Sequence, residues 1–425
     1  MAKDKKIESV KGMNDILPPD SGLWLAFERI ICDWATSYGY QFIRTPILEK
    51  TNLFVRSIGE ATDIVEKEMY TFMDYDESVT MRPENTASCV RAVLEKNLIR
   101  ERPQRLWYTG PMFRHEKPQL GRYRQFYQTG VEALGFPGPD VDVELIIMTH
   151  ELWKKLGIDQ YVELHINTLG QKEERQAHRK ALIAYFEQHQ DILDEDCKRR
   201  LYVNPLRILD SKNPDLQNII EAAPKLSEYL QAESIQFYNT FKSALDALQI
   251  RYVENPRLVR GLDYYNLTVF EWVTTELGSQ GTVCGGGRYD GLVEELGGKP
   301  TPGVGFAMGL DRLLLLIKEK GRLTDHFSNP DVYIVHQGEN SNIYAFKTAE
   351  SLRKQGLNVL QYSGQAANFK KQMSRANDSG ALAVVIIGED EIAANNLTLK
   401  HLREEQPQQT LNLEQAIIQL KQWKK

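Results

Sequence analysis

The chain has 425 residues, of which 42% are hydrophobic and 26% are charged, and its formal net charge is -6 at pH 7. A chain of this length exceeds one compact core, so we expect a globular protein with two or three domains. The acidic balance argues against a protein whose whole surface is basic, so any nucleic-acid contact is expected in a local groove.

Two further features of the sequence concern location. The first ten residues, MAKDKKIESV, lack the apolar core of a signal peptide, and the apolar run LLLLI at 313–317 is too short to span a bilayer. The four cysteines lie far apart and form no CxxC pair, which argues against structural zinc and a disulfide framework. We therefore expect a soluble, cytoplasmic protein with reduced thiols, no protein-held metal site and no membrane contact.

The first eighty residues combine helical and extended patterns. Apolar residues recur at helical spacing over 23–38, which predicts a helix. The stretch 41–54 is predicted to be a strand interrupted by Pro46, and proline confines such a strand to an edge or an interface. Two more strands are expected at 68–74 and 79–82, with a polar turn between them.

The run RPENTASCVRAVLEKNL, residues 82–98, predicts a strand end that passes into a helix at about 86–97. Asn85 or Thr86 is expected to cap this helix. On pattern alone, Glu84, Asn85 and Thr86 are interpreted first as capping residues and second as functional ones.

The most strongly cationic pattern lies at 114–132, RHEKPQLGRYRQFYQTGVE. We interpret this stretch as the end of a strand, a long polar loop and a second strand. Arginine is a planar, permanently charged fork that binds phosphate or carboxylate in two places at once. The pattern therefore predicts a site for a polyanionic substrate on an antiparallel sheet.

The predicted secondary structure changes several times along the rest of the chain. A helix at about 141–156 and a strand at 161–169 precede a mainly helical insertion over about 171–250. Strands return after it, and GVGFAMGLDRLLLLI predicts a glycine-rich strand leading into a helix. We attribute the glycines of this strand to helix–sheet packing. A polar linker at 318–330 then leads to short apolar strands alternating with helices, which predicts a small α/β domain from Asp331 onward.

Arg114, Arg260 and Arg312 share a setting, because each is expected at a strand end with glycines close by. A single arginine of this kind is more often a solvated surface charge. Three together suit a phosphate whose negative charge is redistributed in a transition state. The sequence has no P-loop, HExxH or GxSxG motif, which argues against P-loop nucleotide binding, zinc peptidase chemistry and serine hydrolysis.

The same segments carry a resemblance to a known family. RTPILEKTNLF is similar to class II aminoacyl-tRNA synthetase motif 1, FRHE through Glu132 to motif 2, and GVGFAMGLDRL to motif 3. LVRGLDYY and GGGRYDGL resemble the two signatures that are special to the histidyl-tRNA synthetases. The resemblance covers nearly the whole chain. One departure is Asn85, since the family often has RPEGT where this chain has RPENT.

This resemblance implies an α+β fold. A class II antiparallel sheet flanked by helices, with the helical insertion, is expected in 1–325, and a C-terminal α/β anticodon-binding domain in 331–425. The implied function is ATP-dependent ligation of L-histidine to tRNA(His) through a histidyl-adenylate, with release of pyrophosphate and AMP. ATP enters as a substrate whose Mg²⁺ is held mainly by the nucleotide. A homodimer is implied, because motif 1 lies at a two-fold interface in this class.

The resemblance also implies two catalytic residues, Arg114 and Arg260. Arg114 is expected to contact the α-phosphate and the amino-acid carboxylate, and Arg260 is expected by the α-phosphate, where other class II enzymes tend to place a metal. Both are therefore also counted as histidine-binding. The remaining ATP contacts are expected from the motif 2 loop, from a residue stacked on the adenine and from the motif 3 arginine: Glu116, Arg122, Phe126 and Arg312.

On the histidine side, the resemblance implies one set of residues for the α-amino end and another for the imidazole. The first set is Glu84, Thr86 and Gln128. The second is Glu132, Tyr264 and Tyr265, with Tyr289 as a further lining residue. A carboxylate and a tyrosine hydroxyl can pair both imidazole nitrogens, whereas an apolar or isosteric amino acid would leave these buried groups unpaired.

Two alternatives stay open at this point. A regulatory subunit of ATP phosphoribosyltransferase resembles the catalytic core but lacks the anticodon-binding domain and commonly loses signature residues. A synthetase for another amino acid, such as proline or threonine, would lack the histidine signatures. The intact LVRGLDYY and the complete α/β pattern at 331–425 favour the histidine enzyme.

Overall fold

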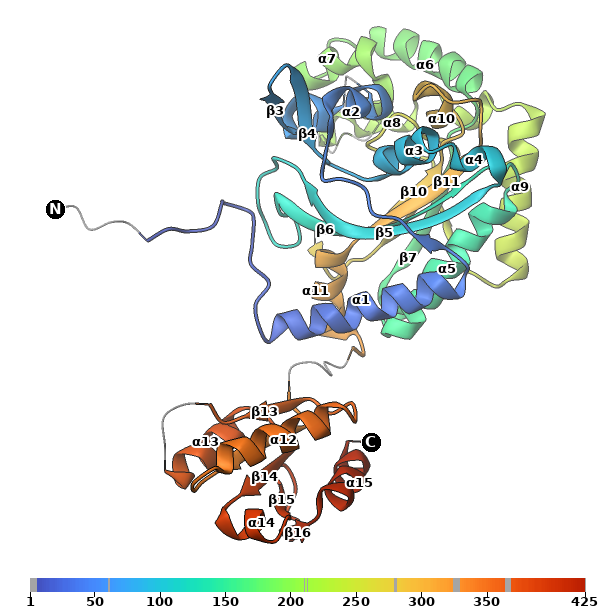
Figure 1. Ribbon diagram of the computed structural model, residues 1–425. Helices are drawn as coiled ribbons and strands as arrows, with labels where there is room; N and C mark the ends of the chain where they lie inside the picture. The colour runs from blue at the N-terminus through green and yellow to red at the C-terminus, as the bar shows by residue number, and fades with distance from the viewer. Residues whose placement is uncertain are drawn as a thin grey trace, which may run out of the picture. The chain divides into compact units, whose positions relative to one another are not determined.

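Figure 1 shows the computed structural model, which describes residues 6–59, 62–209, 211, 213–278, 281–323, 329–363 and 368–424. The chain divides into two compact units, one of Met1–Asp15 with Glu28–Leu323 and one of Ile16–Phe27 with Thr324–Lys425. The predicted linker begins later than expected, because helix α11 (Leu310–Lys320) runs into it. Residues 324–328 of that linker lie outside the described residues.

The larger unit is built on an eight-stranded sheet. Its strands are, in spatial order, β1 (Gln41–Phe42), β5 (Gln104–Phe113), β6 (Gln125–Leu134), β11 (Gly303–Gly309), β10 (Thr282–Arg288), β9 (Asn266–Val273), β7 (Glu163–Thr168) and β8 (Val253–Glu254). All neighbouring pairs are antiparallel except the two edge pairs, β1 with β5 and β7 with β8. The predicted antiparallel sheet is confirmed.

Strands β5 and β6 form the predicted hairpin. Their pairing runs from Gln104 opposite Leu134 to Phe113 opposite Gln125, so the loop that joins them covers residues 114–124. The backbone closes the base of this loop, because Arg114 N donates to Arg124 O at 2.9 Å. The interpretation of 114–132 as strand end, polar loop and strand is therefore confirmed.

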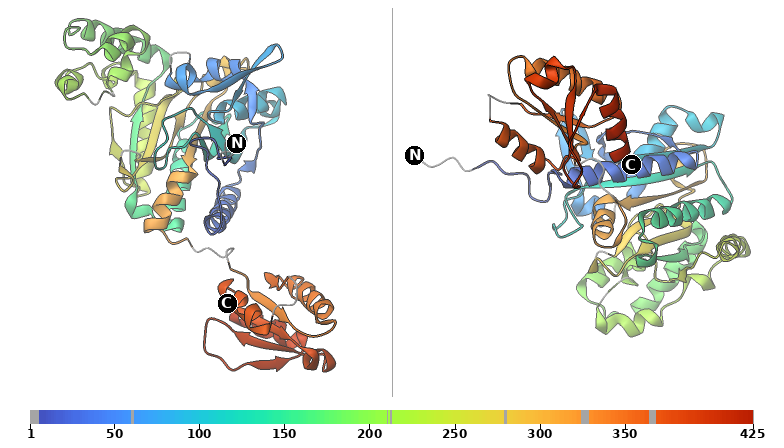
Figure 2. Two further views of the ribbon diagram at one scale, coloured as in Figure 1. Left: turned by 90° about the vertical axis from the view of Figure 1, so that its left-hand side faces the viewer. Right: turned by 90° about the horizontal axis from the view of Figure 1, so that it is seen from below.

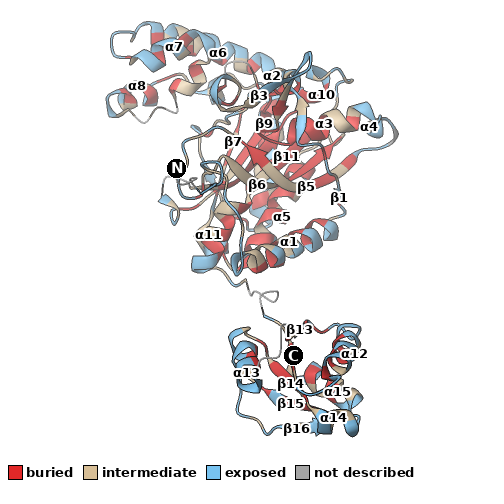
Figure 3. Cartoon of the chain, turned by 60° about the vertical axis from the view of Figure 1, so that its left-hand side comes forward, coloured by how far each residue is buried: buried red, intermediate tan, exposed pale blue. Residues whose placement is uncertain are grey.

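Helices cover both faces of this sheet (Figure 1). Helix α3 (Thr86–Glu95) lies on one side and packs its buried Cys89, Val90 and Val93 against the sheet. On the other side lie α5 (Asp140–Leu156) and α11. Helix α1 (Asp20–Ser37) is joined to α5 by a bond from Trp34 Nε1 to Met148 O at 2.8 Å. Figure 3 shows that the central strands are mostly buried, with stretches of intermediate burial on β5 and β6.

The segment predicted as a strand at 41–54 is only partly extended. After β1, β2 (Leu48–Lys50) joins a three-stranded sheet with β4 (Glu77–Met81) and β3 (Tyr70–Asp74). Residues 51–54 instead begin helix α2 (Thr51–Ile58), so the strand prediction is wrong for them. The reason is burial on one helical face, since Leu53, Phe54 and Ile58 recur at helical spacing and lie in a common core. The remaining short elements of this unit are η1 (Ile64–Glu68), α4 (Leu98–Glu101), η2 (Asp159–Tyr161) and α10 (Leu292–Glu295).

The predicted helical insertion contains two kinds of helix. Its last helix, α9 (Ala232–Ala247), packs on α5 and β9 and so covers the sheet. The described residues of 172–228 precede it and form a lobe with its own core, which we call the insertion lobe (Figure 2, green). The lobe consists of α6 (Lys172–Glu187), α7 (Glu195–Val203), η3 (Pro205–Ile208), η4 (Pro214–Leu216), α8 (Gln217–Glu221) and η5 (Leu226–Glu228).

The C-terminal unit has the predicted α/β pattern, extended by two strands. Its sheet has the order β13 (Val359–Gln361), β12 (Val332–His336), β14 (Ala383–Ile387), β15 (Leu397–His401) and β16 (Gln409–Leu411). The first three strands are parallel, and β15 and β16 add antiparallel to β14. The helices are α12 (Ser341–Arg353), α13 (Phe369–Asp378), α14 (Glu389–Ala393) and α15 (Leu413–Trp423).

Candidate active site

A cavity of about 180 Å³ lies over the large sheet, beside the first turn of α3. It is lined by most of the residues that the sequence singled out: Glu84, Thr86, Arg114, Glu116, Arg122, Phe126, Gln128, Arg260, Tyr264, Tyr265 and Arg312. The two others, Glu132 and Tyr289, do not line this cavity. They are buried next to it, and each is linked by a side-chain contact to a lining residue.

Strand β6 explains how one segment serves both ends of this cavity. Successive side chains of a strand point to opposite faces, so Phe126, Gln128, Gly130 and Glu132 share one face of the sheet. Phe126 lies near the polar loop, and Glu132 lies six residues farther along the strand. Gln128 lies between them, and its side-chain Oε1 is buried without a hydrogen-bond partner among the described residues. That acceptor is free for a donor from a bound molecule.

Three hydroxyl groups hold the Glu132 carboxylate. Thr86 Oγ1 donates to its Oε1 at 2.7 Å, Tyr108 OH donates to the same oxygen at 3.1 Å, and Tyr289 OH donates to Oε2. Burial raises the pKa of the Glu132 carboxyl to about 8, although the bonds from these hydroxyls lower it. Glu132 is therefore oriented at both oxygens before any ligand arrives.

Tyr108 was not predicted as a site residue. It lies on β5 directly opposite Gly130, two residues before Glu132 on β6. A Cβ at position 130 would lie 2.2 Å from the Tyr108 hydroxyl oxygen, so glycine is needed for this ring to pass across β6. The available signal was the hairpin register, which places a tyrosine opposite a glycine next to a buried carboxylate.

Glycines in β10 and β11 make room for the functional side chains. A Cβ at Gly305 would lie 2.0 Å from Glu132 Oε2, and a Cβ at Gly303 would lie 2.4 Å from the Tyr289 ring. A Cβ at Gly285 would lie 2.4 Å from an Arg260 guanidinium nitrogen. The attribution of the GVGFAMG glycines to helix–sheet packing is therefore wrong for Gly303 and Gly305, which accommodate neighbouring side chains within the sheet.

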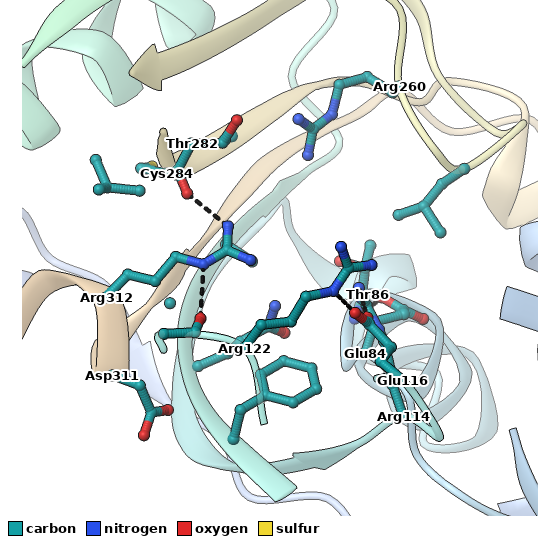
Figure 4. Close-up of a pocket in the computed structure, with 18 of the residues that line it drawn as sticks. Glu84, Thr86, Arg114, Glu116, Arg122, Arg260, Thr282, Cys284, Asp311 and Arg312 are labelled. Atoms are coloured by element: carbon teal, nitrogen blue, oxygen red, sulfur yellow. Dashed lines mark hydrogen bonds and ion pairs between the residues drawn. The ribbon is translucent and has the colours of Figure 1, made fainter. Parts of the chain in front are cut away.

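The hairpin loop contributes two arginines to the cavity. Arg114 Nε donates to Pro83 O at 2.9 Å, and its guanidinium lies 5.3 Å from the centre of the Phe126 ring. Arg122 is paired with Glu116 (Figure 4). Only part of each guanidinium fork is used by these contacts, which leaves donors for an anion.

Arg312 reaches the same space from the first turn of α11, as predicted. Its guanidinium donates to Gly121 O at 2.9 Å and to Thr282 O at 2.8 Å (Figure 4). Burial lowers the pKa of Arg312, and the neighbouring Arg122 and Arg114 lower it further. The cavity thus concentrates positive charge that a polyanion would neutralise.

Arg260 does not sit at a strand end, and that prediction is wrong. It lies in the loop between β8 and β9, and its guanidinium points into the cavity opposite Arg122 and Arg312 (Figure 4). Its NH1 group is paired with Glu271 of β9. The loop escapes the strand pattern because its apolar residues face the site and the insertion lobe rather than a neighbouring strand.

Glu84 is the residue that caps helix α3, where Asn85 or Thr86 was expected. Its Oε2 accepts from Thr86 N at 2.7 Å and its Oε1 accepts from Ala87 N at 3.1 Å, whereas the Asn85 side chain makes no cap bond. A carboxylate at a helix start is favoured by the helix dipole. Burial raises the pKa of Glu84, and the two amide bonds act against that rise. Capping and lining the cavity are therefore compatible in one side chain.

A family model described as histidyl-tRNA synthetase matches residues 12–313, and a model described as anticodon binding domain matches residues 331–423. The chain belongs to the histidyl-tRNA synthetase family. A histidine–tRNA ligase of Laribacter hongkongensis is 59% identical over 409 residues, which is 96% of each chain. One of Neisseria meningitidis serogroup B is 57% identical over 429 residues, 99% of each chain. The crystal structure of apo S. aureus histidyl-tRNA synthetase has a TM-score of 0.82 at 36% identity, covering 99% of this chain and 100% of that one.

The departure of this family member at Asn85 is tolerated by the backbone. Asn85 has φ −125° and ψ −4°, which is outside the left-handed region where glycine is favoured. Its Oδ1 accepts from Thr45 Oγ1 at 2.6 Å and from Arg82 NH1 at 3.1 Å. The asparagine thus adds bonds behind the site without straining it.

The raised pKa of Glu132 predicts how the stability of this synthetase depends on pH. The folded state holds the Glu132 proton up to about pH 8, whereas an ordinary carboxyl releases it near 4.5. More protons are then bound in the folded than in the unfolded state, so this contribution to stability is lost as pH rises through 8. We expect the contribution of Glu132 to the free energy of unfolding to fall by about 1 kcal/mol between pH 7 and 9.

Denaturant unfolding of the wild type and of Glu132→Gln at pH 7 and pH 9 checks this expectation. The amide is isosteric with the carboxyl and does not titrate, so the difference between the two proteins isolates Glu132. Parallel pH profiles for the two proteins would contradict a Glu132 pKa near 8.

Proposed function

We infer that the chain is a histidine–tRNA ligase, which joins L-histidine to tRNA(His) at the expense of ATP. In the first step, the histidine carboxylate attacks the α-phosphate of ATP, so that histidyl-adenylate forms and pyrophosphate leaves. In the second step, the terminal ribose hydroxyl of the tRNA attacks the adenylate and AMP leaves. The observation that carries this function is a cavity that is lined by several arginines and lies next to a preoriented buried carboxylate, in a chain that matches the family over both units.

The cationic end of the cavity supports the phosphate chemistry. We assign Arg114 and Arg260 to the α-phosphate, where their fixed positive charge would stabilise the charge that develops during in-line attack. ATP would also contact Glu116, Arg122, Phe126 and Arg312. Positioning and electrostatics account for this reaction without a nucleophilic side chain.

The buried end of the cavity supports selection of histidine. We assign the imidazole to Glu132, Tyr264 and Tyr265, with Tyr289 holding Glu132 from behind. The histidine α-amino end would contact Glu84, Thr86 and Gln128, and the unpartnered Gln128 Oε1 supplies an acceptor for that ammonium group. An amino acid without two side-chain polar atoms would give the buried Glu132 carboxyl no additional hydrogen-bond partner.

Mg²⁺ is proposed to enter with ATP and to be held mainly by its phosphates. The carboxylates that line the cavity are already bonded: Glu84 to two amides, Glu116 to Arg122, and Asp311 to the Tyr127 amide at 2.8 Å. Such residues fit a site where the nucleotide supplies most of the metal's ligands. When bound, the ion would neutralise charge on the leaving pyrophosphate.

We place the catalytic domain at 1–325 and the anticodon-binding domain at 331–425. A homodimer is proposed as well, because apolar side chains remain exposed in motif 1, just before it on β1, and on β3, which belongs to the same three-stranded sheet as β2. These are Phe42, Ile47, Leu48, Phe72 and Met73, each at least 42% exposed. Exposed apolar groups gathered on strands of this kind mark interaction surfaces.

A cytoplasmic location is proposed from the thiols. Cys32, Cys89, Cys197 and Cys284 are all free, which suits a reducing compartment. No helix in the described part of the chain has the length and apolar character needed to cross a membrane.

The function is tested by amino-acid-dependent ATP–pyrophosphate exchange. The purified chain is expected to catalyse exchange with L-histidine and with none of the other standard amino acids, because only histidine can pair with Glu132 and a tyrosine hydroxyl at once. A Glu132→Ala variant serves as the matched control and is expected to lose histidine-dependent exchange. Exchange with another amino acid would overturn the specificity, and a lack of exchange with every amino acid would favour the regulatory-subunit alternative.

A further inference from the structure

The loop that carries Arg260 makes contacts on two sides. One face lines the active-site cavity through Arg260, Leu262, Tyr264 and Tyr265. The other face meets the insertion lobe around a second, smaller cavity of about 60 Å³. The lobe contributes residues from α6, from the end of α7, from η3 and from η5: Arg175, His178, Asn204, Leu206, Arg207 and Leu226. The catalytic loop is thus enclosed between the sheet and a lobe that has its own core.

Arg175 of α6 makes the most direct of these contacts. Its guanidinium donates to the backbone carbonyl of Tyr265, whose ring lines the active site and lies 5.5 Å from the Arg260 guanidinium. A hydrogen bond from a charged donor is stronger than one between neutral groups. Arg175 therefore ties the lobe to the backbone of a residue assigned to the imidazole.

Asp263 forms a second connection at the outer end of the same loop. Asn204 Nδ2 lies 3.5 Å from its Oδ1, and the guanidinium groups of Arg207 and Arg175 are near enough to act on its charge. On the catalytic side, Asp263 N donates to Ile58 O at 3.1 Å. Arg207 also lies against the backbone beside Arg260, since a Cβ at Gly261 would be 3.5 Å from its NH2.

The described residues of the insertion lobe touch the loop but do not reach the active-site cavity. Among the described residues that line the active-site cavity, none belongs to 172–228. The loop that the lobe holds is therefore a route by which the lobe can influence the chemistry. The contacts reach the loop on both sides of Tyr264, which restricts rotation of the segment as a whole.

We propose that Arg175 and Arg207 are positioning residues through which the insertion lobe holds the 258–265 loop in its active arrangement. This inference rests on the proposed histidine ligase function. Arg175 sets the place of Tyr265 and so the affinity for histidine, and Arg207 supports the backbone at Arg260. A change in the lobe is transmitted to amino-acid activation by this route.

Replacing Arg175 by alanine tests the proposal, with Arg179→Ala as the matched control. Arg179 lies one turn along α6 and also donates to backbone carbonyls, but its acceptors, Tyr202 and Val203, are inside the lobe. We expect Arg175→Ala to raise the KM for histidine about tenfold, since small displacements of positioning groups have effects of this order or larger. The KM for ATP is expected to stay within about twofold, and Arg175→Lys is expected to recover part of the loss.

Hydrogen exchange supplies a readout that does not depend on activity. The backbone amides of 258–265, including that of Asp263, are expected to exchange faster in Arg175→Ala and Arg207→Ala than in the wild type or Arg179→Ala. If Arg175→Ala left both the KM for histidine and the hydrogen-exchange rates of the 258–265 amides unchanged, the proposal would be overturned. Equal changes in Arg175→Ala and Arg179→Ala would also overturn it, because they would show general weakening of the lobe. If the wild type showed no histidine-dependent ATP–pyrophosphate exchange, the proposed ligase function would be refuted. The proposed contact between the lobe and the loop would then be tested by hydrogen exchange alone.

Discussion

Replacement of Arg260 by alanine is expected to lower histidine-dependent ATP–pyrophosphate exchange by about 10²–10³-fold, the range found when one preoriented electrostatic donor is removed from an active site. Arg260 is partly buried and its guanidinium points into the cavity. Glu271 pairs with it there, and Gly285 leaves the room that it occupies. Its charge acts where the α-phosphate is proposed to lie, so the loss is expected mainly in kcat. Arg260→Lys keeps the charge but not the fork, and is expected to recover only part of the rate.

The control for this experiment is Arg105→Ala. Arg105 lies on β5, pairs with Glu144 at 3.2 Å and does not line the cavity. The ATP–pyrophosphate exchange rate of Arg105→Ala is expected to remain within about twofold of the wild-type rate. The thermal unfolding midpoint of Arg260→Ala is expected to stay close to that of the wild type. Near-normal exchange in Arg260→Ala would refute the role assigned to this arginine, and loss of fold would be seen in the melting curve.

Replacement of Arg288 by alanine is expected to reduce stability by about 3–5 kcal/mol, because it would leave a buried carboxylate without its partner. Arg288 is completely buried and pairs with Asp142, which is also completely buried. It also donates to Phe136 O at 2.9 Å and to Gly138 O at 2.8 Å. The arginine of the GGGRYDGL signature is therefore a structural tie between β10 and the start of α5, on the face opposite the cavity.

Thermal unfolding measures this effect, and a fall in the midpoint on the order of 10 °C is expected for the larger unit. The double variant Asp142→Asn with Arg288→Met removes both charges and is expected to be less destabilised than Arg288→Ala. A midpoint for Arg288→Ala within a degree of the wild type would show that the buried pair contributes little. If the double variant were the less stable protein, the explanation by an unpaired charge would be wrong.

Local patterns were sufficient for most of the architecture. The hairpin from β5 to β6 followed from alternating polarity on both sides of a polar loop, and the α/β character of the C-terminal unit followed from short apolar strands between amphipathic helices. Residues 51–54 were the exception, since their apolar side chains suit either a strand or a helix until the core that they enter is known. The roles of the cavity-lining residues stay predictions, although the fold does bring them together.

The sequence by itself determined which segments carry the site, because motif spacing and strand alternation are properties of neighbouring residues. It could not show that Tyr108 and Thr86 hold Glu132, that Gly305 makes room for this carboxylate, or that Arg260 lies in a loop. Only the tertiary structure decided these points, because each depends on strand register or on contacts between residues far apart in the chain. The same reason explains why the insertion lobe was predicted as helices, while its hold on the catalytic loop became visible only in the folded molecule.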